Sequence, residues 1–428
     1  MIPSLLLAAT FAAPAFAANT DVLPGTPAVR TLRDAYLAAL ENSDSVAISE
    51  QTLRQAEALY RSARGSSFPL ISLRNDTSRQ DRRSAGTAGS GNATNTQSDG
   101  MIRASQSGLT GYRELALLKA AKSTVGQREH ERLRAEQLLL ADVAGAYYSL
   151  IQAQDNVATT GQLIKFADKR LSEIKERVRV GRAREADALS QEVQSEALHS
   201  QLEESSRQVS ARGDLLGFLV RSSIEPQASP TDSPAPPPAL DAYLARLESR
   251  PDVAAARDAV AVAAGGVNVA RGDYFPQLGL QANYYAYRPR ARSNNKWDAS
   301  ASVSLPIFSF GAIHASVDSA KAALSRQEYV LRATQRAADL EVRNAHRDYS
   351  SAVRQLDIQR RSGALAQRDY KLQTQDEHRG LVTAIEVLQS LDRLNIATLA
   401  LNNALVQTRL AAINLEIAAG AKPEEILK

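Results

Sequence analysis

The sequence contains no cysteine among its 428 residues. This absence excludes disulfides, thiolate metal sites and cysteine nucleophiles, and it predicts no lipid attached to an N-terminal cysteine. Aromatic residues are scarce as well, at 5% of the chain, whereas hydrophobic residues make up 44%. With Ala, Leu, Gln, Arg and Ser dominant, this composition favours long helices whose contacts are made by small side chains.

A strong excess of either charge is also absent. The formal net charge is +4, and Lys and Arg alternate with Asp and Glu along the expected helices. Such alternation is typical of solvated helix faces with i,i+4 ion pairs. The sequence therefore predicts no nucleic-acid partner.

Catalytic and metal-binding motifs are missing. The chain has no G-x-S-x-G, no G-x-x-x-x-G-K-[ST], and no G-x-G-x-x-G after a strand. The five histidines are scattered and form no H-x-x-x-H pair; they are His130, His199, His314, His346 and His378. The sequence predicts no enzyme, no cofactor and no metal site.

Long hydrophobic runs are absent beyond the N-terminus. Residues 1–17 combine an apolar run from Leu5 with Ala15-Phe16-Ala17, a small-x-small cleavage signature. We interpret them as a secretory signal peptide. No later run reaches eighteen apolar residues, so the mature chain is expected to lack a membrane-spanning helix.

The chain contains two copies of one sequence pattern. DAYLAALE and ARGSSFPLISL, within 34–73, reappear as DAYLARLE and ARGDYFPQLGL, within 241–280. Sixteen of these forty positions are identical at a constant offset of 207, and later matches follow an offset of 199. A fixed spacing of this kind indicates an internal duplication.

A proline-rich stretch separates the copies, and its composition predicts an extended linker. We therefore divide the mature chain into a first repeat at 18–220, a linker at 221–239 and a second repeat at 240–428.

Each repeat opens with an Ala-rich helix, at 45–66 and 252–271. Proline disfavours helical geometry in the residue before it, so these helices should stop just ahead of Pro69 and Pro276. Strand hairpins are predicted at 70–109 and 277–307. Pro306 marks the return from strand to helix in the second copy.

The second hairpin alternates apolar and polar residues. Trp297, Ala299, Ala301 and Val303 are interleaved with Asp298, Ser300 and Ser302. Strands of about ten residues can cross a bilayer when tilted, with aromatics such as Tyr284 and Trp297 at the membrane interface. A half-buried soluble hairpin is the alternative. In the first hairpin, Arg74, Asp76 and Arg103 are expected on the polar face.

Long proline-free helices follow each hairpin, at about 112–179 and 311–378, with coiled-coil-like apolar spacing. Each breaks at a glycine, Gly181 or Gly380, and returns as a second helix at 185–219 or 384–418. Because glycine adopts the left-handed conformation that ends helices, these breaks predict tight helix–helix turns.

Taken together, these residues resemble the TolC-type outer-membrane efflux family. The resemblance rests on the duplication, the FPxxxL step into each hairpin, LPIFSFG at 305–311 and GLVTAIEVLQSLDRLN at 380–395. It implies a mainly α fold with a small β part. Three chains would close a twelve-stranded transmembrane barrel, and their long helices would form a periplasmic tunnel.

The resemblance also implies a role and partners. The homotrimer would be an exit duct in the outer membrane, in contact with lipid. It would work with a periplasmic adaptor and an inner-membrane pump of the RND or ABC type, in efflux or type I secretion. Alternatives are a periplasmic coiled-coil adaptor and a soluble coiled-coil protein. Drugs, metal ions and secreted proteins all remain open as cargo.

Family resemblance further assigns the periplasmic constriction. Acidic residues six positions past each turn glycine would line it, here Asp187 and Glu386. Where the family often carries a further Asp, this chain has Gln389, so the resemblance does not extend to a second acidic ring. Three arginines are candidates for clamping the closed turns by pairing with these acids, namely Arg182, Arg184 and Arg379.

Overall fold

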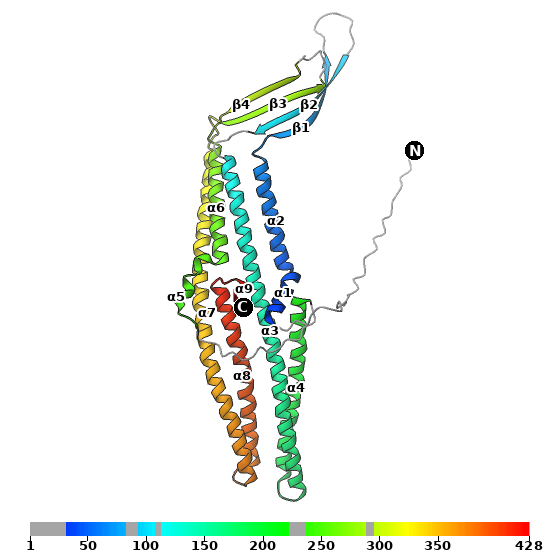
Figure 1. The fold of residues 1–428 in the computed structure, drawn as a ribbon, viewed down its shortest axis with the longest axis vertical. Helices are drawn as coiled ribbons and strands as arrows, with labels where there is room; N and C mark the ends of the chain where they lie inside the picture. Colours follow the sequence, from blue (N-terminus) through cyan, green and yellow to red (C-terminus); the bar gives the residue numbers. More distant parts are fainter. Residues whose placement is uncertain (1–30, 83–92, 108–112, 222–235, 288–294, 428) are drawn as a thin grey trace, which may run out of the picture.

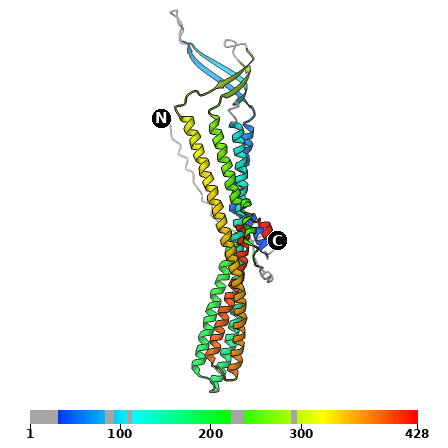
Figure 2. The ribbon, with the colours of Figure 1, turned by 90° about the vertical axis from the view of Figure 1, so that its left-hand side faces the viewer.

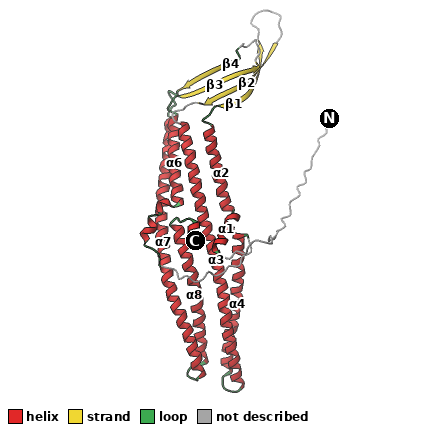
Figure 3. Ribbon diagram, viewed as in Figure 1, coloured by secondary structure: helices red, strands yellow, loops and turns green. Residues whose placement is uncertain are grey.

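The fold is built of long helices that carry a small sheet at one end (Figures 1 and 3). The computed structural model describes residues 31–82, 93–107, 113–221, 236–287 and 295–427. The predicted signal peptide, 1–17, and most of the linker lie outside the described residues.

The two repeats contain matching elements. The first comprises α1 (Leu32–Asn42), α2 (Asp44–Gly65), β1 (Leu70–Arg82), β2 (Ala93–Ser107), α3 (Arg113–Arg179) and α4 (Glu185–Val220). The second comprises α5 (Leu240–Leu244), the 3-10 helix η1 (Leu247–Ser249), α6 (Pro251–Gly272), β3 (Gln277–Tyr287), β4 (Trp297–Ser304), α7 (Ala312–His378) and α8 (Ala384–Ala418). A short α9 (Pro423–Ile426) follows. The predicted fold class, a duplicated helix–hairpin–helix repeat, is confirmed.

The predicted ranges 45–66 and 252–271 agree with α2 and α6 to within one residue at each end, but the helices do not continue up to the prolines. α2 ends at Gly65 and α6 at Gly272, not at the phenylalanine before each proline. A tight turn fills the gap, since the Phe68 amide donates to the Gly65 carbonyl and the Phe275 amide to that of Gly272. Helix ends commonly tighten in this way, because their last carbonyls need new donors.

α3 and α7 set the length of the molecule. Each has 67 residues, which corresponds to about 100 Å at 1.5 Å per residue. α2 and α4 pack along opposite halves of α3, while α6 and α8 do the same along α7 (Figures 1 and 2). The repeats meet where α3 packs on α6 and α8.

The repeated DAYLA sequence anchors each copy at mid-length. Tyr36 belongs to a buried cluster with Val143, and Tyr243 to an equivalent cluster with Val342. Both valines are fully buried. The duplicated DAYLA segment therefore makes the same packing contact in each repeat, on α3 in the first and on α7 in the second.

The helix predicted at 252–271 is part of a longer apolar segment. The stretch 240–272 is apolar and long enough, by composition, to cross a membrane, and 28% of its most apolar window is buried. Arg257 and Asp258 interrupt the run, which is why a search for uninterrupted apolar residues overlooked it. Its main helix, α6, packs along α3 and α7.

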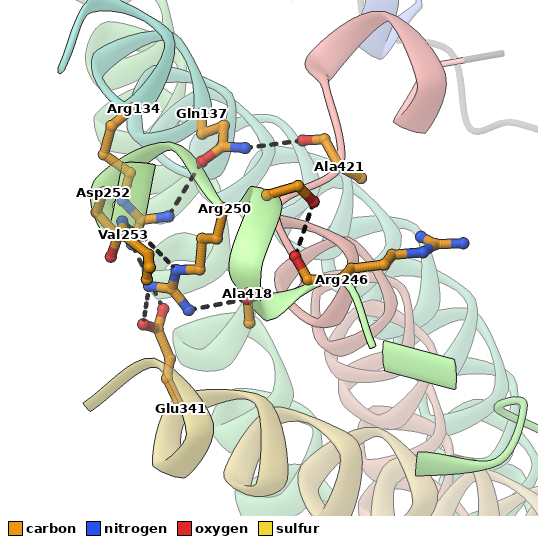
Figure 4. Close-up of polar contacts among 10 residues, drawn as sticks. Arg134, Gln137, Arg246, Arg250, Asp252, Val253, Glu341, Ala418 and Ala421 are labelled. Atoms are coloured by element: carbon orange, nitrogen blue, oxygen red, sulfur yellow. Dashed lines mark hydrogen bonds and ion pairs between the residues drawn. The ribbon is translucent and has the colours of Figure 1, made fainter. Parts of the chain in front are cut away.

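A buried arginine joins the start of α6 to α7 and to the end of α8 (Figure 4). Arg250, 1% exposed, lies at the start of α6. Its guanidinium donates to the Ala418 carbonyl and the Asp252 carboxylate, each at 2.8 Å, and pairs with Glu341 on α7. All three nitrogens of the guanidinium are thus satisfied inside the protein.

The contacts extend to α3. Arg134 donates to the Gln137 side chain at 3.2 Å, and Gln137 donates to the Ala421 carbonyl at 2.9 Å. Gly420, just before, has φ +86°, and a Cβ there would lie 3.1 Å from the Arg250 Cα. Only glycine fits this left-handed and closely approached position.

Replacing Arg250 with alanine is expected to destabilise the fold, because the Ala418 carbonyl and the Asp252 carboxylate lose their donor and Glu341 keeps only its contact with Arg134 at 3.5 Å. Leaving a buried polar group unsatisfied typically costs about 1–3 kcal/mol. Chemical denaturation of the purified protein should show this loss. Arg246→Ala is the matched control, since Arg246 is half exposed and pairs with Glu416 at 3.4 Å. Equal effects of the two variants would contradict a special role for Arg250.

Candidate functional site

The sheet places one row of apolar side chains across all four strands. Its order is β1-β2-β3-β4, antiparallel throughout. Leu73, Ile102, Tyr284 and Trp297 lie opposite one another in successive pairs. All four are exposed in one chain, from 46% for Ile102 to 82% for Leu73. The face they share is therefore an uncovered apolar surface.

The opposite face is polar and partly buried. Ser72, Arg103, Asn283 and Asp298 form the neighbouring row. Asn283 is 6% exposed although no described element packs on the sheet, because Arg103 and Asp298 hydrogen-bond across it. The sheet thus presents apolar residues on one face and polar residues on the other. In a closed membrane barrel the apolar face is the outer face and the polar face the inner face.

This distribution is the reverse of a soluble sheet's and is typical of a transmembrane barrel, with lipid outside and water inside. The prolines mark its boundary with the helices. β1 and β3 each begin one residue after Pro69 or Pro276, and Pro306 lies between β4 and α7.

The second candidate site is at the far end of the helices, where α3 turns into α4 and α7 into α8. Gly181 and Gly380 have φ of +72° and +77°. At each turn the glycine amide donates to the carbonyl three residues back, and the next amide donates five residues back. These paired bonds close the helix end as a Schellman motif.

Both predicted acids lie in the first turn of the returning helix. Glu386 closes a capping box with Thr383, whose amide donates to the carboxylate at 2.6 Å and whose hydroxyl donates at 2.9 Å. The backbone bond, then the hydroxyl bond, lowers the pKa of Glu386, so its carboxylate is charged at neutral pH. Asp187 holds the equivalent position in α4.

The predicted clamping arginines behave differently from one another. Arg184 pairs with Asp187 at 2.8 Å, and its role as a clamp stays a prediction. Arg379 pairs instead with Asp376 on its own helix, at 3.5 Å, and Arg182 has no ion pair within the described residues. The capping box explains why Arg379 does not pair with Glu386. It turns the Glu386 carboxylate toward Thr383 and away from the preceding turn.

A contact that the sequence did not indicate joins the two turns. Glu377, at the end of α7, lies 2.7 Å from both Arg170 and Arg177 of α3. Arg177 also lies 3.1 Å from Nδ1 of His378. Arg170 and Glu377 are separated by about two hundred residues, and no local pattern marks either one. The side chains are 5% and 8% exposed.

Burial by itself would raise the pKa of Glu377, but Arg170 and Arg177 outweigh it and lower that pKa. A lowered pKa means that folding favours the charged form. The link therefore contributes its full stabilisation above the ordinary glutamate pKa of about 4.3 and loses it as the pH falls below that value.

Within the described ranges, no three His, Asp or Glu side chains are grouped so as to hold a metal ion. The first site is a sheet with one apolar and one polar face, as in a membrane barrel, and the second is the pair of turns at the far end of the helices. In the described residues, neither site groups reactive side chains in a cleft. Together they define a channel that spans a membrane and continues as a helical tunnel.

Comparison with known proteins identifies the class. Residues 35–212 and 243–421 match the outer membrane efflux protein family, and the chain belongs to this family. The chain is therefore an outer-membrane channel of an efflux system, with its helices in the periplasm. The adaptor and the soluble coiled-coil alternatives are set aside.

Similar proteins and structures agree with this assignment. The pyoverdine export outer membrane protein OpmQ of Pseudomonas aeruginosa is 27% identical over 89% of this chain and 82% of its own. The toluene efflux pump outer membrane protein TtgC of Pseudomonas putida is 26% identical over 66% and 60%. The VceC structure from Vibrio cholerae covers 91% of this chain and 96% of its own, with a TM-score of 0.79 at 19% identity.

Glu377→Gln is expected to loosen the contact between the two turns, because it leaves the buried Arg170 with only the more distant Glu173, at 3.6 Å, as a charged partner. We expect a local loss of about 2 kcal/mol, measured as faster hydrogen exchange at 165–182 and 373–386. Glu176→Gln is the matched control, since its pair with Arg179 is exposed. After correction for the intrinsic pH dependence of amide exchange, protection in the wild type should fall below about pH 4, and protection in the variant should not. Equal protection in both variants would contradict the link.

Proposed function

We propose that three copies of this chain form the exit duct of a tripartite export system. Three four-stranded sheets would supply twelve strands of one closed barrel. The long helices would continue it as a tunnel across the periplasm. The duct would perform no chemistry on its cargo, which would move by diffusion once a pump has delivered it.

The sheet carries this proposal. Its apolar face is uncovered, and the outer edges of β1 and β4 have no strand partner in the described part of one chain. Lipid tolerates neither unpaired edges nor an open sheet, because it offers no hydrogen bonds. Pairing β4 of one copy with β1 of the next removes both edges at once.

The partners follow from the role. A duct without an energy source needs a pump in the inner membrane, of the RND or ABC type, and a periplasmic adaptor to join them. Relatives are named for pyoverdine export and for toluene efflux. For this chain we propose small-molecule efflux through the duct.

The periplasmic end is the proposed constriction. Symmetry would turn Glu386 into a ring of three carboxylates, with Asp187 nearby on the equivalent turn. Crowded carboxylates favour cations over anions. The contact of Glu377 with Arg170 and Arg177 would hold the turns closed, and Arg184 would hold Asp187.

Neighbouring positions on β4 test the two faces of the barrel. Ala301 lies on the apolar face and Ser300 on the polar face, and both are exposed in one chain. Ala301→Arg should cost about 2–4 kcal/mol in the membrane and prevent recovery of a heat-modifiable trimer from outer-membrane fractions. Ser300→Arg, facing water, should still give that trimer. Recovery of both variants as soluble monomers, like the wild type, would refute the barrel.

Glu386→Gln tests the constriction. Glutamine can also close a capping box, so the variant removes the charge and keeps the helix end. We expect a lower cation preference in single-channel recordings, seen as a smaller reversal potential in a salt gradient. Glu204→Gln, an exposed α4 carboxylate paired with Arg207, is the control. An unchanged reversal potential for Glu386→Gln would leave Glu386 as a capping residue only.

A further inference from the structure

The helices between the middle of the molecule and the turns at Gly181 and Gly380 leave two free sides. In this half α7 packs on α8, α8 on α3, and α3 on α4. The helices α7 and α4 therefore lie at opposite sides of the wall, as Figure 1 shows. In the described part of one chain they are not packed on each other, so each leaves one face without a helix partner.

The free face of α7 carries an apolar stripe with arginines beside it. Ile358, Leu365 and Leu372 recur every seven residues and are 48–67% exposed. They lie across the helix from the buried Leu356, because two residues correspond to about 200° of helix rotation. Exposed arginines precede each of them by four residues, and one more continues the spacing toward the middle; they are Arg354, Arg361, Arg368 and Arg347. An apolar heptad stripe flanked by charge is typical of a helix that pairs with another helix.

The free face of α4 carries the opposite charge. Glu196, Glu203 and Asp214 are exposed, and their spacings of seven and eleven residues place them on one face of the helix. Leu189 and Val193, which are 56% and 69% exposed, lie beside them. None of the three acids forms an ion pair with another described residue. This face is thus an apolar stripe flanked by unpaired carboxylates.

The two faces match in height. Three arginines of α7 and the three acids of α4 lie at similar distances along the chain from Gly380 and Gly181, and both turns are at the same end of the molecule (Figure 1). The distances differ by three residues or fewer, about 4.5 Å of helix, which an arginine side chain can span. The pairs are Arg368 with Glu196, Arg361 with Glu203, and Arg347 with Asp214.

We propose that α7 of one copy pairs with α4 of the next copy through these three arginine–carboxylate pairs, the charge zipper. The inference rests on the proposed trimer and assigns the surface that joins its helices near the periplasmic end. A three-fold axis along the helices changes no heights, so residues level with each other in one chain stay level between copies. The apolar stripes would supply packing, and the charges would set partner and register.

The arginines are available for such pairing. Within the described residues Arg368 has no ion pair, and Arg347 bonds only to uncharged groups, the Arg343 carbonyl and the Asn344 side chain. Arg361 pairs with Asp357 at 2.7 Å, and both side chains are more than 60% exposed. An exposed pair of this kind is worth little, so it can be shared with a second carboxylate.

Arg354 stays outside the zipper. At its level α4 holds Arg207, which already pairs with Glu204 at 2.6 Å. The zipper therefore has a gap between its upper pair and its two lower pairs.

A periplasmic adaptor is the rival occupant of these faces. A second copy is favoured, because this chain itself carries both complementary charges at matching heights. The sheet points to the same neighbours: β4 leads into α7, and α2, which leads into β1, lies above α4 on the other side (Figure 1). Joining β4 to β1 of the next copy thus brings α7 to the side where that copy presents α4.

Thiol cross-linking tests the pairing without background, since the chain has no cysteine. Arg368→Cys with Glu196→Cys in one chain, treated as purified trimer with a short bismaleimide, should give covalent dimers and trimers on denaturing gels. The matched control is Arg368→Cys with Gln194→Cys. Gln194 is two residues from Glu196 and so on the other side of α4, and this control should stay monomeric on the gel.

Charge reversal tests the electrostatic part. In the Arg368→Cys, Glu196→Cys chain, Arg361→Glu should slow cross-linking about fivefold, and adding Glu203→Arg should restore the rate. Salt at about 1 M should slow it as well, because it screens exposed pairs. Glu204→Gln, on α4 but outside the zipper, should leave the rate unchanged.

Every variant is first checked as a heat-modifiable trimer, and Arg347→Cys with Asp214→Cys replaces the first pair if that pair does not assemble. Cross-links confined to single chains would overturn the inference, as would a reversed pair that does not recover. Thiols that stay open in an intact trimer would also overturn it and give the faces to the adaptor. A wild type that forms no trimer would instead refute the proposed function.

Discussion

The unpaired edges of the four-stranded sheet are the constraint on which the rest of the structure depends. A sheet of this size has an apolar outer face, a polar inner face and two free edges, at β1 and β4. In lipid such edges are prohibitive, because every backbone amide and carbonyl there must be bonded by protein. A single chain therefore cannot close the sheet by itself. In the proposed trimer, each of the two repeats in a chain supplies one sixth of the barrel.

Closing the barrel also dictates the design of the helices. Each strand must leave the membrane and become a helix, so the chain changes period at Pro69, Pro276 and Pro306. The middle of the helical part is held by buried contacts, around Arg250 and around the paired tyrosines of the two repeats. The far end is held differently, by a short ion-pair cluster at Glu377.

Local chemistry made much of this predictable. The left-handed turns at Gly181 and Gly380 and the apolar row ending in Trp297 followed from residue type and period alone. The contacts of Arg250 and Glu377 did not, because their partners are up to about two hundred residues away and a charged residue on a helix usually faces water. Arg379 was assigned to the wrong partner for a related reason, since a capping hydrogen bond competes for the nearest carboxylate.

By itself, the sequence determined the duplication, the order of helices and strands, and which strand residues share a face, because these depend on neighbours a few positions apart. Only the tertiary structure decided which charges are buried together and how the polar row of the sheet is bonded. Those outcomes depend on which segments packing brings side by side. Whether a charged side chain is buried away from water depends on how the helices and strands pack together, and not on any one element.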